Sequence, residues 1–405
     1  MADFFQFGKI TTLHRLTERP LEEMERELYE FAKKRPIGLI LPSLFSELEG
    51  PALSKILDEL QDAKYLSHII IGLDRADETQ FRHAQEFFSR LPQKTHLLWQ
   101  DGPRLRALDE ELKARELSPP EPGKGRNVWF CMGYALAIDE LEAIGLHDCD
   151  IVTYSRDLPA RLLYPLAHPH FGFEYAKGYY ARVNGDKLSG RVTRLFVTPL
   201  LRALRLMVGP HDYLEYMDSF RYPLSGEFAM SRDLASQVRI PSDWGLEVGL
   251  LSEVYRNISH HQICQVDIAD QYDHKHQDLS AEDRQGGLAK MSRDIAKSFY
   301  RKLATEGVQM NQAFFRSLKA AYLRKALDMV EMYYHDAILN ALAFNRHAEE
   351  EAIEVFQQCI VEAGQAFLDN PLEAPFIPNW KRVLSAMPDF SARLFEAVKQ
   401  DTETL

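Results

Sequence analysis

Two aspartates, Asp148 and Asp150, stand on either side of one residue at the end of a short apolar run, residues 143–146. Their carboxylates leave the backbone close together, and like charges at that spacing repel each other unless a cation lies between them. Mg²⁺ and Mn²⁺ take oxygen ligands and also bind substrate phosphates. The pair therefore indicates a site for a metal ion and a diphosphate. A solvated acidic turn is the alternative that so short a motif leaves open.

A glycine-rich segment with one lysine, Gly123-Lys124-Gly125, comes just upstream of the aspartates. It ends a proline-rich stretch, residues 115–126, which is predicted as a loop, and it leads into a helix predicted over residues 128–142. Glycines let backbone N–H groups approach an anion, a helix N-terminus favours negative charge, and the lysine adds positive charge. These features indicate a phosphate contact, with a flexible turn as the alternative.

A second anion-binding candidate is Gly190-Arg191-Val192-Thr193. Because Pro199 interrupts the apolar stretch that follows, Arg191 and Thr193 lie either in a first helical turn or in the loop before it. In a first turn the N–H groups are unpaired. An arginine there can fork onto a phosphate or carboxylate, and a threonine can add a hydroxyl. A capping threonine beside a solvated arginine is the alternative.

Two glutamates and one histidine complete the set of candidate residues. Glu227 stands in an apolar stretch of small residues, so it is either buried with partners or functional. Glu247 lies at an apolar helix start, where pairing with the helix dipole is the alternative role. His274 could complete a metal shell begun by Asp148 and Asp150, or it could belong to a solvated turn.

The elements that must position these residues follow from hydrophobic spacing. Residues 37–41, 68–74 and 95–99 are short apolar runs that predict buried strands, and helical patterns separate them. This alternation implies right-handed crossovers and a parallel sheet. Ligands bind outside the carboxyl ends of such strands, an edge that would hold residues 42–47 and Asp74.

Further along the chain, residues 173–180 and 263–268 are predicted as strands, and the pattern is helical from about residue 281. An amphipathic helix is predicted at residues 21–34, within a leading arm. The apolar stripes of the C-terminal helices predict packing or oligomer surfaces.

Composition excludes several classes of protein. The chain has 405 residues, enough for two or three domain-sized units, and a formal net charge of −12, which argues against a nucleic-acid-binding surface. Its four cysteines lie far apart, which fits a reducing cytoplasm, and no apolar run reaches the length of a membrane span. We therefore expect a cytoplasmic protein without membrane spans.

Taken together, the motifs resemble a known family. In chain order they are Gly-Lys-Gly-x-Asn, Asp-x-Asp, Lys-Gly-Tyr-Tyr, Gly-Arg-Val-Thr, Pro-Leu-x-Gly-Glu-Phe-Ala, Gly-x-Glu-x-Gly-Leu-Leu and a late histidine. This series resembles the retaining GT-A glycosyltransferases that make glucosyl-3-phosphoglycerate, with the mannosyl-3-phosphoglycerate synthases as close relatives. The resemblance covers about residues 37–280.

The resemblance implies an α/β protein with a GT-A fold, which is a Rossmann-like mixed sheet flanked by helices, here with a C-terminal helical extension. It implies a nucleotide-sugar-binding half (37–150) and an acceptor-binding half (151–280). The sequence pattern outside the resemblance predicts an N-terminal arm (1–36) and a helical C-terminal region (281–405).

The resemblance also implies roles for individual residues. Those that would hold Mg²⁺ or Mn²⁺ are Asp148, Asp150 and His274, with His276 as a competing ligand. Those that would lie at the nucleotide sugar are Pro42, Leu44, Glu47, Asp74, Lys124 and Asp148. Those that would grip 3-phosphoglycerate are Gly190, Arg191, Thr193 and Lys177. Glu227 would face the donor sugar, and Glu247 would lie near the reaction centre.

The implied activity is metal-dependent, retaining transfer of a hexose from UDP-glucose or a GDP-sugar to 3-phosphoglycerate. Glucose is the expected hexose, and the sequence leaves mannose open. A homodimer is expected. The base is open, because the family's usual Pro-Ala-Leu-Asn-Glu-Glu stretch reads Pro-Ser-Leu-Phe-Ser-Glu at residues 42–47. One alternative is a mannosyl-3-phosphoglycerate synthase. The other is a non-catalytic sensor of nucleotide sugars or phosphometabolites, which would be expected to lose part of the metal set that this chain retains.

Overall fold

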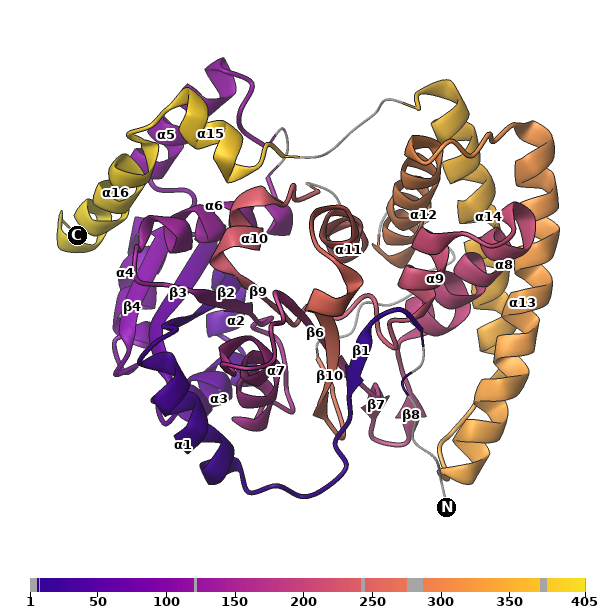
Figure 1. The fold of residues 1–405 in the computed structure, drawn as a ribbon, viewed down its shortest axis with the longest axis horizontal. Helices are drawn as coiled ribbons and strands as arrows, with labels where there is room; N and C mark the ends of the chain where they lie inside the picture. Colours follow the sequence, from indigo (N-terminus) through magenta and orange to yellow (C-terminus); the bar gives the residue numbers. More distant parts are fainter. Residues whose placement is uncertain are drawn as a thin grey trace.

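A computed structural model describes residues 6, 8–119, 122–241, 245–274, 287–371 and 377–404. Eight strands within these ranges form one sheet through the centre of the molecule, in the order β1-β10-β6-β9-β5-β2-β3-β4 (Figure 1). They are β1 (Thr11–Leu13), β2 (Ile37–Leu44), β3 (Leu66–Asp74), β4 (Lys94–Trp99), β5 (Ala143–Leu146), β6 (Tyr175–Tyr180), β9 (Phe228–Ser231) and β10 (Ile263–Ala269). A small hairpin, β7 (Val183–Asn184) and β8 (Lys187–Leu188), stands apart from this sheet.

The three apolar runs near the N-terminus form β2, β3 and β4, as predicted. Isoleucines and leucines suit these parallel strands because helices cover both faces of the sheet. β2 continues beyond the predicted end at residue 41 to Leu44, because it stays paired with β3 as far as Asp74. The helices of this half are α2 (Phe45–Leu48), α3 (Pro51–Leu60), α4 (Glu78–Phe88), α5 (Pro103–Ala114) and α6 (Lys124–Ala137).

Helix α6 corrects one boundary. It begins at Lys124 and ends at Ala137, four residues before its predicted start and five before its predicted end. Gly123, with φ of 148°, precedes its first turn, whereas Gly125 is buried inside it. The helix packs on β3, where Asn127 Nδ2 donates to the carbonyl of Gly72 at 2.7 Å. This packing brings Lys124 to the carboxyl ends of the strands.

The sheet is mixed, as the resemblance implies, rather than wholly parallel. Strand β9 pairs antiparallel with β5 on one side and with β6 on the other. No hydrophobic pattern in the sequence predicted the strand at residues 228–231. Because β9 runs against its neighbours, its first residues lie beside the last residues of β5. Glu227 is thereby placed near Asp148.

The helices that come after β5 in the sequence cover the second half of the sheet. They are α7 (Asp157–Ala167), the π-helical segment η1 (Val192–Val197), α8 (Thr198–Val208), α9 (Asp212–Asp218), α10 (Arg232–Gln237), α11 (Leu246–Asn257) and the short 3-10 segment η2 (His260–Gln262). The N-terminal arm joins this half, since β1 pairs with β10 and α1 (Leu21–Ala32) packs on α7.

The C-terminal helices form two groups at opposite ends of the molecule (Figure 1). Helices α12 (Gly287–Thr305), α13 (Gln312–Leu339) and α14 (Arg346–Asp369) pack on one another and on α8 and η1. Helices α15 (Trp380–Ala386) and α16 (Phe390–Thr404) return to the first half, where α16 contacts α5, α6 and β4. Each half of the molecule is thus covered by a different group of C-terminal helices.

Within the described ranges, no helix is both long enough and apolar enough to cross a membrane.

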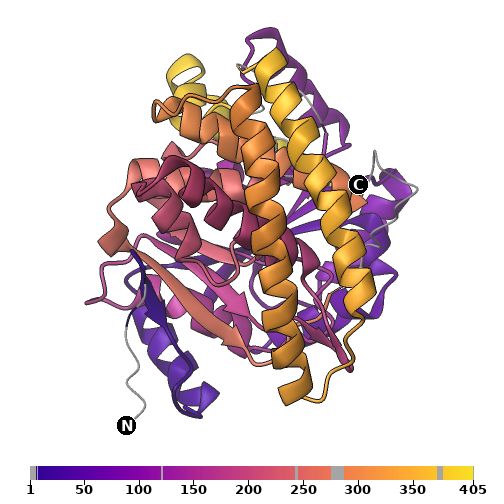
Figure 2. The same ribbon diagram turned by 90° about the vertical axis from the view of Figure 1, so that its right-hand side faces the viewer.

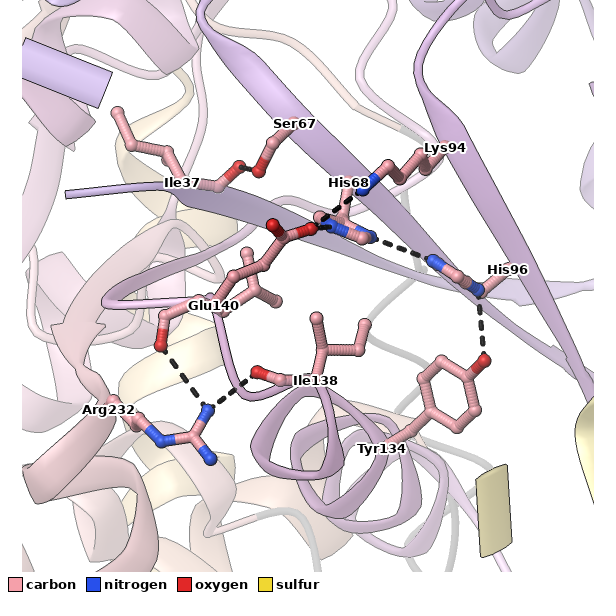
Figure 3. A network of polar contacts seen from close by, with 10 residues as sticks. Ile37, Ser67, His68, Lys94, His96, Tyr134, Ile138, Glu140 and Arg232 are labelled. Atoms are coloured by element: carbon pink, nitrogen blue, oxygen red, sulfur yellow. Dashed lines mark hydrogen bonds and ion pairs between the residues drawn. The ribbon is translucent and has the colours of Figure 1, made fainter. Parts of the chain in front are cut away.

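A polar network closes the edge of the sheet opposite the carboxyl ends of the strands (Figure 3). His68 Nε2 contacts Glu140 Oε1 at 2.5 Å, and His68 Nδ1 contacts His96 Nε2 at 2.8 Å. His96 Nδ1 in turn meets the Tyr134 hydroxyl at 2.9 Å, and Lys94 pairs with Glu140 at 2.8 Å. The network links β3, β4 and α6 through their side chains.

Candidate active site

The paired aspartates lie just beyond the carboxyl end of β5. The N–H of His147 still bonds the carbonyl of Ile40 in β2 at 3.1 Å, so the turn begins from a fixed strand. Ile151 then bridges to His274, and the N–H of Val152 donates to the carbonyl of Asp273 at 2.9 Å. These backbone contacts join two segments more than 120 residues apart in sequence. They explain why a histidine after β10 reaches the aspartate pair.

Asp150 and His274 are neighbours. Asp150 Oδ2 lies 3.5 Å from His274 Nδ1. Burial works to raise the pKa of Asp150, but the hydrogen bond and charge of His274 outweigh it, so the pKa is lowered. The other oxygen, Oδ1, is buried and has no hydrogen-bond partner among the described residues. A buried carboxylate oxygen without a partner, beside an imidazole, fits a ligand of a divalent cation.

Asp148 lies beside Lys124, a contact that the sequence did not predict. Lys124 Nζ lies 2.7 Å from Asp148 Oδ1 and 3.5 Å from Glu247 Oε1. Burial works to lower the pKa of Lys124, but the charges of Asp148 and Glu247 raise it overall. The ammonium therefore stays protonated and lies between the carboxylates of Asp148 and Glu247.

The metal-binding role predicted for Asp148, Asp150 and His274 stays a prediction. Across the part of the chain that the structure describes, no group of three or more His, Cys, Asp or Glu side chains is assembled for a metal ion. The competing ligand His276 lies outside the described residues. The observed arrangement is a pair, Asp150 with His274, next to an aspartate neutralised by Lys124.

Glu227 is fully buried, and two tyrosines that the sequence analysis did not single out hold its carboxylate. Tyr180 donates its hydroxyl to Glu227 Oε2 and Tyr272 donates to Oε1, each at 2.7 Å. The two rings stack with centroids 3.6 Å apart. Burial raises the pKa of Glu227 and the charge of Asp148 adds to this, while the tyrosine hydrogen bonds oppose it. The only sequence signal for these partners is that Tyr180 closes the Lys-Gly-Tyr-Tyr motif and Tyr272 precedes His274.

Lys177 is buried in β6 beneath the same region. Its ammonium donates to the carbonyl of Ser225 at 2.6 Å, and burial lowers its pKa to about 8. It therefore fixes the backbone just before Gly226 and Glu227. Its predicted contact with an acceptor stays a prediction.

The Gly190–Thr193 segment is the first turn of a helical stretch, which decides between the two placements that the sequence left open. Gly190 has φ of 76°, a conformation that favours glycine. The Thr193 hydroxyl is buried without a hydrogen-bond partner among the described residues. Arg191 is not simply solvated, because its Nε lies 2.8 Å from Glu349 Oε1 in α14.

The residues predicted at the nucleotide sugar share one edge of the sheet. Pro42 stands opposite Gly72, and Leu44 opposite Asp74, at the carboxyl ends of β2 and β3. Glu47 follows in α2. Burial and the nearby charge of Asp101 raise the pKa of Asp74. These positions agree with the predicted edge, and their contact with a nucleotide stays a prediction.

Comparison with known proteins agrees with the resemblance of the sequence motifs, although no family model matches the chain. The chain is 50% identical over 401 residues to the glucosyl-3-phosphoglycerate synthase of Persephonella marina, covering 99% of both chains. It is 41% identical over 406 residues to the enzyme of that name from Methanococcoides burtonii, covering 99% of this chain and 98% of the other.

Among solved structures, the glucosyl-3-phosphoglycerate synthase of Mycobacterium tuberculosis, in complex with Mn²⁺, UDP-glucose and phosphoglyceric acid, is similar in fold. The TM-score is 0.53 at 24% identity, covering 73% of this chain and 88% of that chain. Another structure of the same enzyme holds Mg²⁺ and UDP. This likeness confirms the predicted fold.

Proposed function

This chain belongs to the glucosyl-3-phosphoglycerate synthase family, and we propose that it transfers glucose from UDP-glucose to 3-phosphoglycerate with the help of Mg²⁺ or Mn²⁺. Membership confirms the predicted class of enzyme, a nucleotide-sugar-dependent glycosyltransferase. The observation that carries the proposal is 50% identity over 99% of both chains to a named synthase. The contact of Asp150 with His274 supports it, because both stand in the motifs from which the family was predicted.

Asp150 and His274 would hold the metal ion, with Asp148 beside them. When bound, such an ion neutralises the charge that develops on a departing diphosphate. Lys124 contributes a further positive charge at the first turn of α6, where backbone N–H groups also favour an anion. Its present partners, Asp148 and Glu247, keep that ammonium at the carboxyl ends of the strands.

Glu227 orients the donor sugar rather than attacking it. Both of its oxygens already accept a tyrosine hydroxyl, which fixes the carboxylate and reduces its nucleophilicity. Each oxygen keeps a lone pair that can accept from a sugar hydroxyl. Retention by same-face attack needs no protein nucleophile, so an orienting carboxylate is sufficient, and we propose that the anomeric configuration is retained.

The acceptor lies at Gly190, Arg191 and Thr193. The Thr193 hydroxyl, which is buried and has no hydrogen-bond partner among the described residues, and the half-exposed guanidinium of Arg191 supply donors for a phosphate at the start of a helix. Lys177 acts indirectly in this scheme, by holding the Ser225 carbonyl.

Two further proposals concern the state of the protein in the cell. All four cysteines are buried free thiols, which fits the reducing cytoplasm. A homodimer is proposed through α13, whose exposed apolar side chains include Met332, Ile338 and Leu339.

The donor is tested by incubating the purified protein with 3-phosphoglycerate and, in separate reactions, UDP-glucose, GDP-glucose, ADP-glucose and GDP-mannose. We expect nucleotide release with UDP-glucose above all others. Faster release from GDP-mannose would favour the mannosyl-3-phosphoglycerate synthase alternative. Release from none of the donors would contradict the proposed reaction.

The acceptor is tested by Arg191→Ala. A hydrogen bond to a charged group is worth about 1.5–3 kcal/mol, so the KM for 3-phosphoglycerate should rise about 10- to 150-fold. The KM for the donor should change little. Arg191→Lys should rescue only in part, because an ammonium cannot fork onto two oxygens. An unchanged acceptor KM for Arg191→Ala would remove this arginine from the acceptor site.

A further inference from the structure

Glu349, in the first turn of α14, joins the C-terminal helices to the start of η1. Its buried carboxylate accepts from Arg191 Nε through Oε1 and from Arg194 Nη1 through Oε2, both at 2.8 Å. The glutamate is separated from these arginines by more than 150 residues of chain. No motif in the sequence marked it.

Arg194 is the anchor of this contact. Its side chain is 6% exposed, it donates to the carbonyls of Ser189 at 2.9 Å and Leu188 at 3.3 Å, and it lies over the Tyr333 ring of α13. These carbonyls immediately precede Gly190. Arg194 therefore fixes the backbone from which the predicted phosphate-binding turn begins.

A backbone contact supports the same junction. The connection between α13 and α14 meets the β7–β8 hairpin, where the N–H of Ala343 donates to the carbonyl of Asp186 at 2.6 Å. Figure 2 shows α13 and α14 side by side along this face of the molecule. The helical pair thus holds both the hairpin and the helix start that frame Gly190.

Pairing between Glu349 and Arg194 leaves the guanidinium of Arg191 as the positive group that can bind a ligand. Buried charges need partners, and Glu349 matches the buried Arg194. Arg191 is the more exposed arginine, at 39%, and it uses only Nε toward Glu349. Neither of its two terminal nitrogens donates a hydrogen bond to another of the described residues. Those nitrogens are the pair that forks onto two oxygens of a phosphate.

We propose that Glu349 is a positioning residue for the acceptor: it holds Arg191 by Nε so that the two terminal nitrogens face the phosphate of 3-phosphoglycerate. The proposal rests on the proposed function of Arg191. Its physical basis is preorganisation, because a guanidinium already held in the binding orientation loses less freedom when the phosphate arrives. The C-terminal helices then form part of the acceptor site.

The test is Glu349→Gln, with steady-state kinetics against 3-phosphoglycerate and against unphosphorylated glycerate. We expect the KM for 3-phosphoglycerate to rise about tenfold, which corresponds to about 1.4 kcal/mol. The kcat and the donor KM should stay within about twofold, and the preference for the phosphorylated acceptor should fall. The matched control is Glu350→Gln, which removes the neighbouring half-exposed carboxylate that pairs with Arg346.

The outcomes separate this inference from the proposed function. If Arg191→Ala raises the acceptor KM and Glu349→Gln does not, the positioning role is wrong while the acceptor site stands. A lower KM in Glu349→Gln would show that the glutamate competes with the phosphate, which also overturns the inference. Equal losses with both acceptors would mean a purely structural role. If Glu349→Gln does not fold, Glu349→Asp, which keeps the charge on a shorter side chain, should show the same KM change at smaller size.

Discussion

Two close neighbours, Lys124 and Gly226, determine the position of the Asp148 carboxylate. Its carboxylate accepts from Lys124 and also lies against the backbone of Gly226. A Cβ at position 226 would stand 2.3 Å from Asp148 Oδ2, which is closer than real Cβ contacts allow. A side chain at position 226 would therefore displace the Asp148 carboxylate, although the backbone conformation there is not one reserved for glycine.

Gly226→Ala should displace Asp148 and reduce kcat by about 10²-fold, the loss typical of a misplacement of about 1 Å. The matched control is Gly50→Ala, where the new methyl group meets only a carbonyl oxygen at 3.5 Å. Kinetics and thermal unfolding of both variants should be measured. A Gly226→Ala enzyme with normal kcat would show that the position of Asp148 does not limit the reaction.

At the scale of single residues, the sequence predicted those candidate site residues that belong to short motifs. Asp148, Asp150 and the Gly190–Thr193 segment could be found because their chemistry is written in adjacent positions. Tyr272 and Glu349 could not, because their contacts with Glu227 and Arg191 span 45 and 158 residues. Long-range partners of this kind follow from topology and carry no local pattern.

At the scale of elements, the hydrophobic pattern of the sequence predicted strands β2, β3, β4, β6 and β10, with ends that differ from the observed ends by a few residues. The errors have physical causes. α6 begins earlier than predicted because its packing on β3 outweighs the low helix propensity of Gly125. β9 was missed because four residues alone give too little periodicity to distinguish a strand.

The polar network at the far edge of the sheet gives a prediction about pH. Burial lowers the pKa of His96 to about 4, whereas an unfolded histidine titrates near 6.5. Between these values the unfolded chain binds a proton that the folded chain excludes, so folding stability falls as the pH decreases from about 6.5 toward 4. His147, whose pKa burial lowers to about 3, adds a loss of the same sign.

His96→Asn should therefore flatten the pH dependence of the free energy of unfolding over this window. The full effect of one proton is about 1.4 kcal/mol per pH unit, and the partial exposure of His96 reduces it. Urea unfolding at several pH values checks this for both proteins. Parallel curves for wild type and variant would contradict a depressed pKa at His96.

At the scale of the whole molecule, the C-terminal helices are divided between the two halves of the sheet. The sequence predicted their helical character but not this division, which depends on which surfaces the core leaves uncovered. Among the described large apolar side chains, Leu339 at the end of helix α13 has the highest exposed fraction, 83%, and the neighbouring Ile338 is 59% exposed. Such neighbouring apolar residues on a surface mark a candidate contact between subunits.

The homodimer prediction is checked by light scattering during size-exclusion chromatography. We expect twice the chain mass for the wild-type protein and the mass of one chain after the combined substitutions Ile338→Asp and Leu339→Glu. Leu16→Glu, at an exposed leucine of the N-terminal arm, is the control and should stay dimeric. A wild-type protein with the mass of one chain would contradict the prediction.

The central claim is that the Asp148–Asp150–His274 region catalyses metal-dependent transfer of glucose to 3-phosphoglycerate with retention of configuration. The most direct measurement is proton NMR of the reaction of UDP-glucose with 3-phosphoglycerate, with Mg²⁺, with Mn²⁺ and with EDTA. The account predicts an α-glucoside, read from its small anomeric coupling, that forms with either metal and is abolished by EDTA. A β-linked product, or equal product formation in EDTA, would contradict it.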